Sequence, residues 1–383
     1  MKRNPSIPDL FEGDSAWLVV AVYSARSGTT KRGEQYFDAI GFNSTGKIAL
    51  KAWSEACKQW GELSPGLWGI VGRVEMYQEQ PQLVMSEYRR IDLEKFIEQD
   101  GQPPRLPRAY TMDIETVALP EYRQRVPKKL NRELELGNMR LEQQQRYEAD
   151  AQAEIERVYQ LGALSATSGR IVSIAVHVGS NPLFASMGAE VEAREHVFGI
   201  TAENELEDEY YALRGFNALM KEFDPDLDLL VGHNLLNFDL PFIHQRCLVH
   251  GLRSQPVLDL SSFRIPCVYD TMHHWWMGAK KHVSLDEMLW ALGLESSKTA
   301  TADGSRVFEM YHAGQLEEIR EYNLRDIRAT RRAFEIMAET SLATDDPAGG
   351  DQSEPEPAAP AIEVTECTET NSETVKLAKE IDN

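Results

Sequence analysis

The sequence predicts an α/β protein preceded by a small all-β barrel. The first hundred residues contain short segments in which apolar and polar residues alternate, whereas from residue 108 onward short apolar strands alternate with longer helical patterns. The proline-containing segment 101–107 has little apolar content and is predicted to be a linker. With 383 residues, the chain is long enough for two domains that each bury a core.

The first hundred residues predict five strands and one helix. The strands are expected at Trp17–Ser24, Gln35–Phe42, Lys47–Trp53, Leu67–Met76 and Gln82–Arg90, with the helix at Ser54–Trp60. Three strands, a helix and two further strands is the order of an OB barrel. The segments TGKIALKAW (Thr45–Trp53) and GLWGIVGRVEMYQEQPQLVMSEYRRI (Gly66–Ile91) resemble the OB domain attached to certain bacterial exoribonucleases and other single-strand binders. We therefore expect residues 1–100 to form an OB-fold-like domain that binds single-stranded nucleic acid.

Such a barrel commonly holds a single strand by aromatic stacking and a few cations. The candidates in this sequence are Tyr36, Trp53, Trp68, Tyr77 and Tyr88, together with Lys47, Lys51 and Arg73. For each aromatic residue, packing inside the barrel is the favoured alternative, because alternation does not say which face of a strand points inward.

The overall charge limits the possible functions. A formal net charge of -21 argues against a protein that coats nucleic acid non-specifically, because phosphate binding depends largely on positive charge. An active site built from carboxylates is compatible with this charge. The sequence lacks the roughly 18 consecutive apolar residues of a membrane-spanning helix, so we expect no membrane role. Four scattered cysteines and an N-terminus without a signal-peptide core predict a reduced, cytoplasmic protein.

Part of the negative charge lies in the segment 341–383, which contains eleven acidic residues and two lysines. Proline and alanine are interspersed and aromatic residues are scarce, so the segment cannot repay its ordering entropy. It is predicted to be an acidic, disordered tail. The alternative is a peptide that binds a protein partner through Ala361–Asn383, where apolar residues return.

Residues 108–340 predict an α/β domain. Strands are expected at Ala109–Glu115, Arg170–Val178, Val191–Ile200 and Leu227–Val231, and helices at Glu203–Phe223, Leu240–His250, Ser284–Ala291 and Leu316–Met337. The charged segment Glu121–Gln160, between the first two strands, is predicted to be a helical insertion that forms a solvated hairpin. The functional alternative is a basic entry to an active site, formed by Lys128, Lys129, Arg132 and Arg140.

Carboxylates in this domain suggest metal-dependent phosphodiester hydrolysis. That reaction needs an activated water and charge neutralisation, which two divalent ions about 3.5–4 Å apart can provide. Magnesium and manganese prefer oxygen ligands. In AYTMDIETVAL (Ala109–Leu119), strand alternation places Asp113 and Glu115 on one face and Met112 and Ile114 on the other. Alone, this pair fits the polar face of an edge strand equally well.

Two further segments supply candidate residues. In DPDLDLLVGHNLLNFDLPFIHQRC (Asp224–Cys247), Asp239 falls in the first turn of a helix that follows a buried strand, where Asn234 and Phe238 could contact substrate. In EEIREYNLRDIRATRRAF (Glu317–Phe334), Tyr322 and Asp326 are four residues apart and therefore share a helix face. The structural alternative for Asp239 is a helix cap, and that for Phe238 is a core contact. For Glu317–Phe334, the alternative is an amphipathic helix on the surface.

The order DIET, NLLNFD and YNLRD resembles the DEDD superfamily of 3′-to-5′ exonucleases, in its tyrosine subgroup. Phe223–Ile243, Val268–Trp276 (VYDTMHHWW) and Ser284–Leu294 (SLDEMLWALGL) are most similar to the proofreading exonuclease domain of family B DNA polymerases. The resemblance implies an RNase H-like mixed sheet flanked by helices and two Mg²⁺ or Mn²⁺ ions. It also implies that Asp113, Glu115, Asp239 and Asp326 bind metal, that Tyr322 positions the attacking water, and that Asp270 and Asp286 have supporting roles.

The leading hypothesis is a hydrolase that removes nucleotides from the 3′ end of single-stranded DNA. An exoribonuclease is the first alternative, because the superfamily has many RNA-degrading members and contact with the 2′-hydroxyl is not visible in a sequence. A non-catalytic single-strand-binding adaptor is the second, motivated by the barrel and the acidic tail. The complete set of five catalytic candidates argues against the adaptor.

Overall fold

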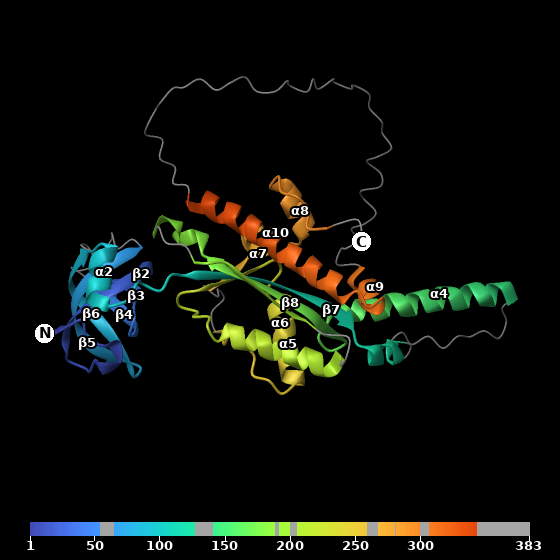
Figure 1. Ribbon diagram of the computed structural model, residues 1–383, viewed down its shortest axis with the longest axis horizontal. Helices are drawn as coiled ribbons and strands as arrows, with labels where there is room; N and C mark the ends of the chain where they lie inside the picture. The colour runs from blue at the N-terminus through green and yellow to red at the C-terminus, as the bar shows by residue number, and fades with distance from the viewer. Residues whose placement is uncertain are drawn as a thin grey trace, which may run out of the picture. The chain divides into compact units, whose positions relative to one another are not determined.

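The N-terminal strands close into a barrel (Figure 1). The computed structural model describes residues 1–53, 65–126, 141–187, 191–199, 205–258, 267–279, 281–298 and 306–342. The barrel strands are β2 (Ser15–Thr29), β3 (Gln35–Asn43), β4 (Gly46–Trp53), β5 (Gly66–Tyr77) and β6 (Gln80–Arg90), with the short β1 (Lys2–Arg3) beside β2. Their order is β2-β3-β4-β6-β5, and β2 pairs with β5 to close the ring. This connectivity is the predicted OB arrangement.

Alternating side chains fill the barrel. Leu18, Val20, Leu50, Ile70 and Leu83 point inward and are fully buried. At Gly72 a Cβ atom would lie 2.5 Å from the carbonyl oxygen of Val84, so only glycine allows β5 to approach β6 at its register shift. The helix α2 (Leu93–Asp100), which the sequence analysis did not predict, follows the barrel and begins at the capping side chain of Asp92.

A second sheet has the order β11-β10-β7-β8-β9. Its strands are β7 (Arg108–Ala118), β8 (Gly169–Ser180), β9 (Arg194–Gly199), β10 (Leu229–Gly232) and β11 (Val268–Asp270). β7, β8 and β9 are antiparallel neighbours, whereas β10 and β11 run parallel to β7. The helices α5 (Glu205–Met220) and α6 (Asp239–Val249) lie on one face of the sheet and α10 (Leu316–Leu342) lies on the other (Figure 1). A mixed sheet flanked by helices confirms the predicted fold class.

The two faces of β7 have different neighbours. Met112 and Ile114 join the main core with residues of α5 and α6. Val117 faces the opposite way and packs with residues of α9 (Val307–His312) and α10. The predicted alternation is therefore confirmed, and it leaves Asp113 and Glu115 facing α10.

The other predicted elements can be compared with the structure one by one. Every predicted strand and helix that lies in the described ranges is present, with end points shifted by a few residues. The charged insertion is helical over α4 (Leu141–Gln160), as predicted, whereas the four basic residues 128, 129, 132 and 140 lie outside the described residues. The predicted helix at 54–60 and the tail from 343 onward also lie outside the description. β11, α7 (Thr271–Trp275), α8 (Leu285–Ala291) and α9 complete the fold.

A buried ion pair holds α5, α6 and β8 together beneath the sheet. The Glu209 carboxylate accepts hydrogen bonds from Arg246 at 2.8 and 2.6 Å, from His250 Nε2 at 2.8 Å and from the backbone N–H of Ile171 at 2.9 Å. Burial alone would raise the pKa of Glu209, but the hydrogen bonds and charge of Arg246 hold that pKa below its ordinary value. No helix in the described part of the chain is long and apolar enough to cross a membrane.

We predict that Glu209→Gln lowers the free energy of unfolding by about 3 to 5 kcal/mol, because it leaves the buried Arg246 guanidinium without its counter-charge. The matched control is Glu317→Gln, which removes an exposed partner of Arg320 and is expected to cost at most about 1 kcal/mol. Urea titration of both variants measures the difference. Equal losses of stability in the two would contradict the role assigned to the buried pair.

Candidate active site

Three carboxylates meet between β7 and α10. Oxygen atoms of Asp113, Glu115 and Asp326 all lie within 4.8 Å of one another. Asp113 and Glu115 are two residues apart on β7, and Asp326 reaches them from α10. Glu115 and Asp326 are buried and Asp113 is partly exposed. The structure therefore brings together three of the four carboxylates that the resemblance implies as metal ligands.

The fourth carboxylate, Asp239, borders this group. It occupies the first turn of α6 and is buried, and its Oδ1 accepts the backbone N–H of Ile114 at 3.1 Å. Ile114 separates Asp113 from Glu115 on β7, so this hydrogen bond holds Asp239 against the strand that carries both of them. A helix cap would not account for this contact, because the Asp239 carboxylate accepts its hydrogen bond from the neighbouring strand β7.

Burial raises the pKa values of all four acids, and repulsion by neighbouring carboxylates raises those of Asp113 and Glu115 further. The pKa of Asp113 is well above its ordinary value because of burial and then the charges of Asp239, Glu115 and Asp326. The pKa of Glu115 is raised by burial and then by Asp326 and Asp239. Burial raises the pKa of Asp239 from 3.8 to about 7, against the opposing hydrogen bond from Ile114. Four ionised carboxylates at this place therefore require nearby positive charge.

The donor set fits a hard divalent cation. All the candidate ligand atoms are carboxylate oxygens, which Mg²⁺ and Mn²⁺ prefer over nitrogen or sulfur. In addition, Oδ1 of Asp326 is buried and has no hydrogen-bond partner among the described residues. A bound cation would satisfy this atom, whose burial without a partner is otherwise costly. The cluster is thus compatible with divalent metal binding.

Tyr322 lies one helical turn before Asp326 and is buried. Burial, followed by the charges of Glu115 and Asp326, raises the pKa of Tyr322 above its ordinary value, so the phenol stays protonated at neutral pH. The predicted shared helix face is confirmed.

The next residue, Asn323, was not selected by the sequence analysis. Its Nδ2 donates to Asp113 Oδ2 at 2.6 Å. In the sequence, only its position inside the YNLRD motif could have pointed to Asn323, because the spacing of neighbouring residues does not reveal a buried amide that bonds to an acid.

The loop between β10 and α6 is held by Asp270. The Asp270 carboxylate accepts the backbone N–H groups of Asn234 at 3.1 Å and Leu236 at 3.0 Å, and it also caps α7. This arrangement agrees with the supporting role expected for Asp270, and Asn234 takes the left-handed conformation with φ 62°. Phe238 is partly buried and packs against Phe242 with ring centroids 5.5 Å apart, so the core contact expected as its alternative is present.

Some aromatic candidates of the barrel are buried and others are exposed. Trp68 and Tyr88 pack with the barrel core, as the alternative for each aromatic residue anticipated. Tyr36 and Trp53 instead pair on the outer surface of β3 and β4, with ring centroids 6.1 Å apart and Trp53 42% exposed. Tyr77 is 61% exposed at the end of β5.

Two of the three candidate cations on the barrel are bound by the protein's own acids. Lys47 forms ion pairs with Asp224 at 2.9 Å and Asp226 at 2.5 Å, and Lys51 forms one with Asp38 at 2.8 Å. Arg73 is exposed. The outer aromatic pair, Tyr77 and Arg73 are therefore exposed to a ligand, whereas Lys47 and Lys51 are paired with acids.

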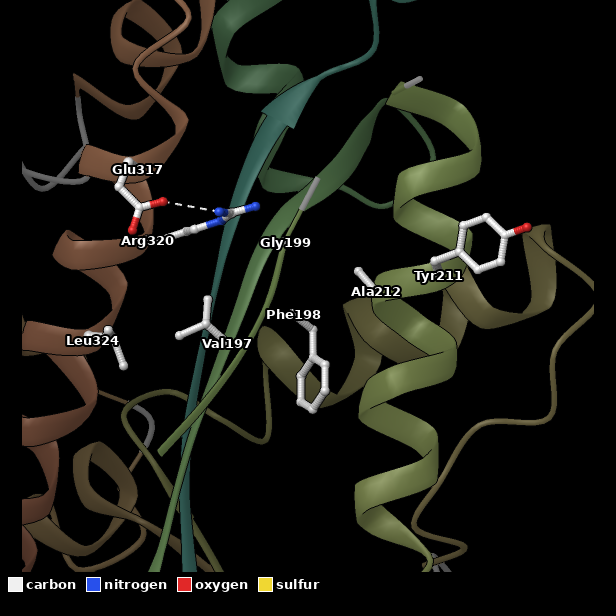
Figure 2. Close-up of a pocket in the computed structure, with 8 residues that line it drawn as sticks. All are labelled: Val197, Phe198, Gly199, Tyr211, Ala212, Glu317, Arg320 and Leu324. Atoms are coloured by element: carbon white, nitrogen blue, oxygen red, sulfur yellow. Dashed lines mark hydrogen bonds and ion pairs between the residues drawn. The ribbon is translucent and has the colours of Figure 1, made fainter. Parts of the chain in front are cut away.

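A shallow cavity of about 450 Å³ lies beside the sheet edge, between β9, α5 and α10 (Figure 2). Arg320 pairs with Glu317 there at 3.0 Å, and its guanidinium approaches Gly199 so closely that a Cβ at that position would lie 3.0 Å from Arg320 Nε. None of the sequence-predicted site residues lines this cavity. The carboxylate cluster and the cavity are thus separate features.

One protein family is similar to the C-terminal part of the described chain. Residues 164–335 match the family described as "Predicted 3'-5' exonuclease related to the exonuclease domain of PolB". This part of the chain is similar to a PolB-related exonuclease domain. The resemblance drawn from the motifs is thereby confirmed. The matched range contains Asp239, Tyr322 and Asp326, whereas Asp113 and Glu115 precede it.

No curated protein matches the chain. Several solved structures are similar to its N-terminal region. A domain of replication protein A from Methanococcus maripaludis is 18% identical, with 24% of this chain and 97% of that chain covered and a TM-score of 0.21. The SSB domain of a Synechococcus sp. protein is 11% identical, with coverages of 21% and 99% and a TM-score of 0.19. PriB from Ralstonia solanacearum is 10% identical, with coverages of 20% and 95% and a TM-score of 0.18.

The raised pKa values of the carboxylate cluster predict an unusual pH dependence of stability. In EDTA, the folded protein holds protons on Asp239 that the unfolded chain releases, so stability should fall as pH rises from about 4 to about 7. Asp239→Asn should flatten this slope. Urea titrations across this range, repeated with excess Mg²⁺, measure the effect, and the cation should reverse the loss. A wild-type stability that rises over this range in EDTA would contradict the electrostatic account.

Proposed function

We propose that this chain is a 3′-to-5′ exonuclease that hydrolyses terminal phosphodiester bonds of single-stranded DNA with two divalent ions, Mg²⁺ or Mn²⁺. One observation carries the proposal: the carboxylates of Asp113, Glu115 and Asp326 converge within 4.8 Å at a site completed by Asp239. The similarity of residues 164–335 to a PolB-related exonuclease supports the reaction class and favours DNA over RNA. In this proposal, residues 108–340 are the catalytic domain and residues 1–100 are a single-strand-binding domain.

The four carboxylates are the proposed metal ligands. Divalent ions at such a site, when bound, lower the energy of negative charge on the attacking and leaving oxygens of phosphodiester hydrolysis. The protein holds the four carboxylates in fixed positions. Strand β7 fixes Asp113 and Glu115 on one face, the Ile114 N–H fixes Asp239, and the long helix α10 presents Asp326. Because three separate elements supply the ligands, the site depends on the packing of the whole domain.

Tyr322 is proposed to position the attacking water. Its protonated hydroxyl lies close to the charges of Glu115 and Asp326, and its oxygen can accept a hydrogen bond from a water beside the carboxylate cluster. Phe238 and Asn234, which lie at the start of α6 and in the preceding loop, are proposed to contact the terminal nucleotide. The exposed part of the Phe238 ring offers a stacking surface next to Asp239.

The barrel is proposed to capture the strand before cleavage. Tyr36 and Trp53 form an exposed aromatic pair on adjacent strands, which is the kind of surface on which bases stack without sequence preference. The negative net charge of the chain makes stacking more important here than a basic groove.

The decisive experiment compares 5′-labelled single-stranded DNA and RNA of one sequence, with Mg²⁺, Mn²⁺ or EDTA. We expect a metal-dependent ladder that shortens from the 3′ end, faster on DNA. Asp113→Asn should reduce the rate at least about 10³-fold because it removes a metal ligand, whereas Glu309→Gln, at an exposed acid of α9, should cleave at the wild-type rate. A faster RNA ladder would favour an exoribonuclease. Binding without any product in the wild type would favour the non-catalytic adaptor and contradict the proposal.

The role of the barrel gives a separate prediction. Trp53→Ala should raise KM on strands of about 30 nucleotides by roughly 5- to 150-fold, because one base–aromatic stack contributes about 1–3 kcal/mol, and it should leave kcat unchanged. The control is Tyr211→Ala, which removes an exposed aromatic residue from α5. An unaltered KM for Trp53→Ala would show that this face of the barrel does not hold the substrate.

A further inference from the structure

We infer that Asn323, held by Ser173, is a positioning residue that fixes the Asp113 carboxylate for metal binding. This inference rests on the proposed function and extends it to two residues that do not themselves belong to the carboxylate set. Both side chains are fully buried, and they form a continuous chain of hydrogen bonds from β8 through α10 to β7.

The hydrogen bonds define the orientation of the Asn323 amide. The Ser173 hydroxyl donates to Asn323 Oδ1 at 2.9 Å, and Asn323 Nδ2 donates to Asp113 Oδ2 at 2.6 Å. With its oxygen accepting from Ser173, the amide can present only its NH₂ group to Asp113. One oxygen of Asp113 is thereby held in place while Oδ1 stays available to a cation.

The strand register explains why these residues can meet. Ser173 lies directly opposite Glu115 on the neighbouring strand, and Ala175 lies opposite Asp113. Both are small and fully buried, so α10 can approach this part of the sheet closely enough for Asn323 to reach Asp113. The pairing of β7 with β8 therefore fixes the position of the Ser173 hydroxyl together with that of Glu115. The two hydrogen bonds from Ser173 through Asn323 to Asp113, called the relay below, link this position to Asp113.

The chemical character of an amide suits this task. Asp113 is repelled by Asp239, Glu115 and Asp326, and without an anchor its carboxylate would rotate away from them. A lysine or arginine in place of Asn323 would hold the carboxylate, but its charge would compete with the cation for the same site. A neutral N–H donor orients the ligand and leaves the negative charge of the cluster in full.

Calorimetric titration of the full chain with Mn²⁺ tests the relay directly. Asn323→Ala should weaken Mn²⁺ binding by about 10- to 100-fold, the usual effect of losing a group that orients a metal ligand. The control is Asn217→Ala, which removes a buried amide that bonds to Gln255 N on the other side of the sheet. It should lower the unfolding temperature and keep the wild-type affinity. Wild-type affinity in Asn323→Ala would overturn the inference.

Ser173→Ala provides a second test that does not alter the residue in contact with Asp113. It should weaken Mn²⁺ binding less than Asn323→Ala, because the amide remains but can rotate. The double variant should bind Mn²⁺ as Asn323→Ala does, because Ser173 acts only through Asn323. Independent, additive losses from the two substitutions would overturn the relay.

The same titrations separate this inference from the proposed function. A wild-type chain that binds Mn²⁺ and cleaves, with Asn323→Ala unchanged in both, would leave the exonuclease proposal standing and remove the relay. A wild-type chain that neither binds Mn²⁺ nor cleaves either strand would overturn the proposed function and the relay together.

Discussion

Repulsion among buried carboxylates is the constraint on which this structure depends. Asp113, Glu115 and Asp326 place oxygens within 4.8 Å of one another, and Asp239 adds a fourth acid against the same strand. Such a group costs folding free energy wherever its members are ionised. The surrounding protein must therefore hold each acid rigidly by other interactions, and a cation that binds only the folded state returns part of that cost.

The fold supplies these other interactions from elements far apart in the sequence. On one face of β7, Met112 and Ile114 anchor the strand in the main core, and Glu209 with Arg246 links the helices beneath it. On the opposite face, α10 contributes Asp326 together with Asn323, whose amide reaches Asp113. Asp270 fixes the loop that leads into α6. The groups that keep these mutually repelling acids in position are thus apolar, neutral or already paired with an opposite charge.

Much of this arrangement could be predicted from the sequence, because it rests on short-range patterns. Strand alternation placed Asp113 and Glu115 on one face, helical spacing paired Tyr322 with Asp326, and turn residues separated the barrel strands. Asn323 and Ser173 were missed because their contact depends on how closely α10 approaches β8, which no local pattern records. The helix α2 was missed although its apolar residues Leu93, Phe96 and Ile97 have helical spacing, because at eight residues it is too short for that spacing to stand out. Likewise, no local pattern in the sequence shows that Asp224 and Asp226 form ion pairs with Lys47 and so occupy a cation that was expected to bind phosphate.

The most direct test of the central claim is anomalous X-ray scattering from crystals of the chain soaked in Mn²⁺. The account predicts two peaks at the carboxylates of Asp113, Glu115, Asp239 and Asp326, with the Asp113 carboxylate in the orientation set by Asn323. Crystals that bind Mn²⁺ elsewhere but show no peak at this cluster would contradict it.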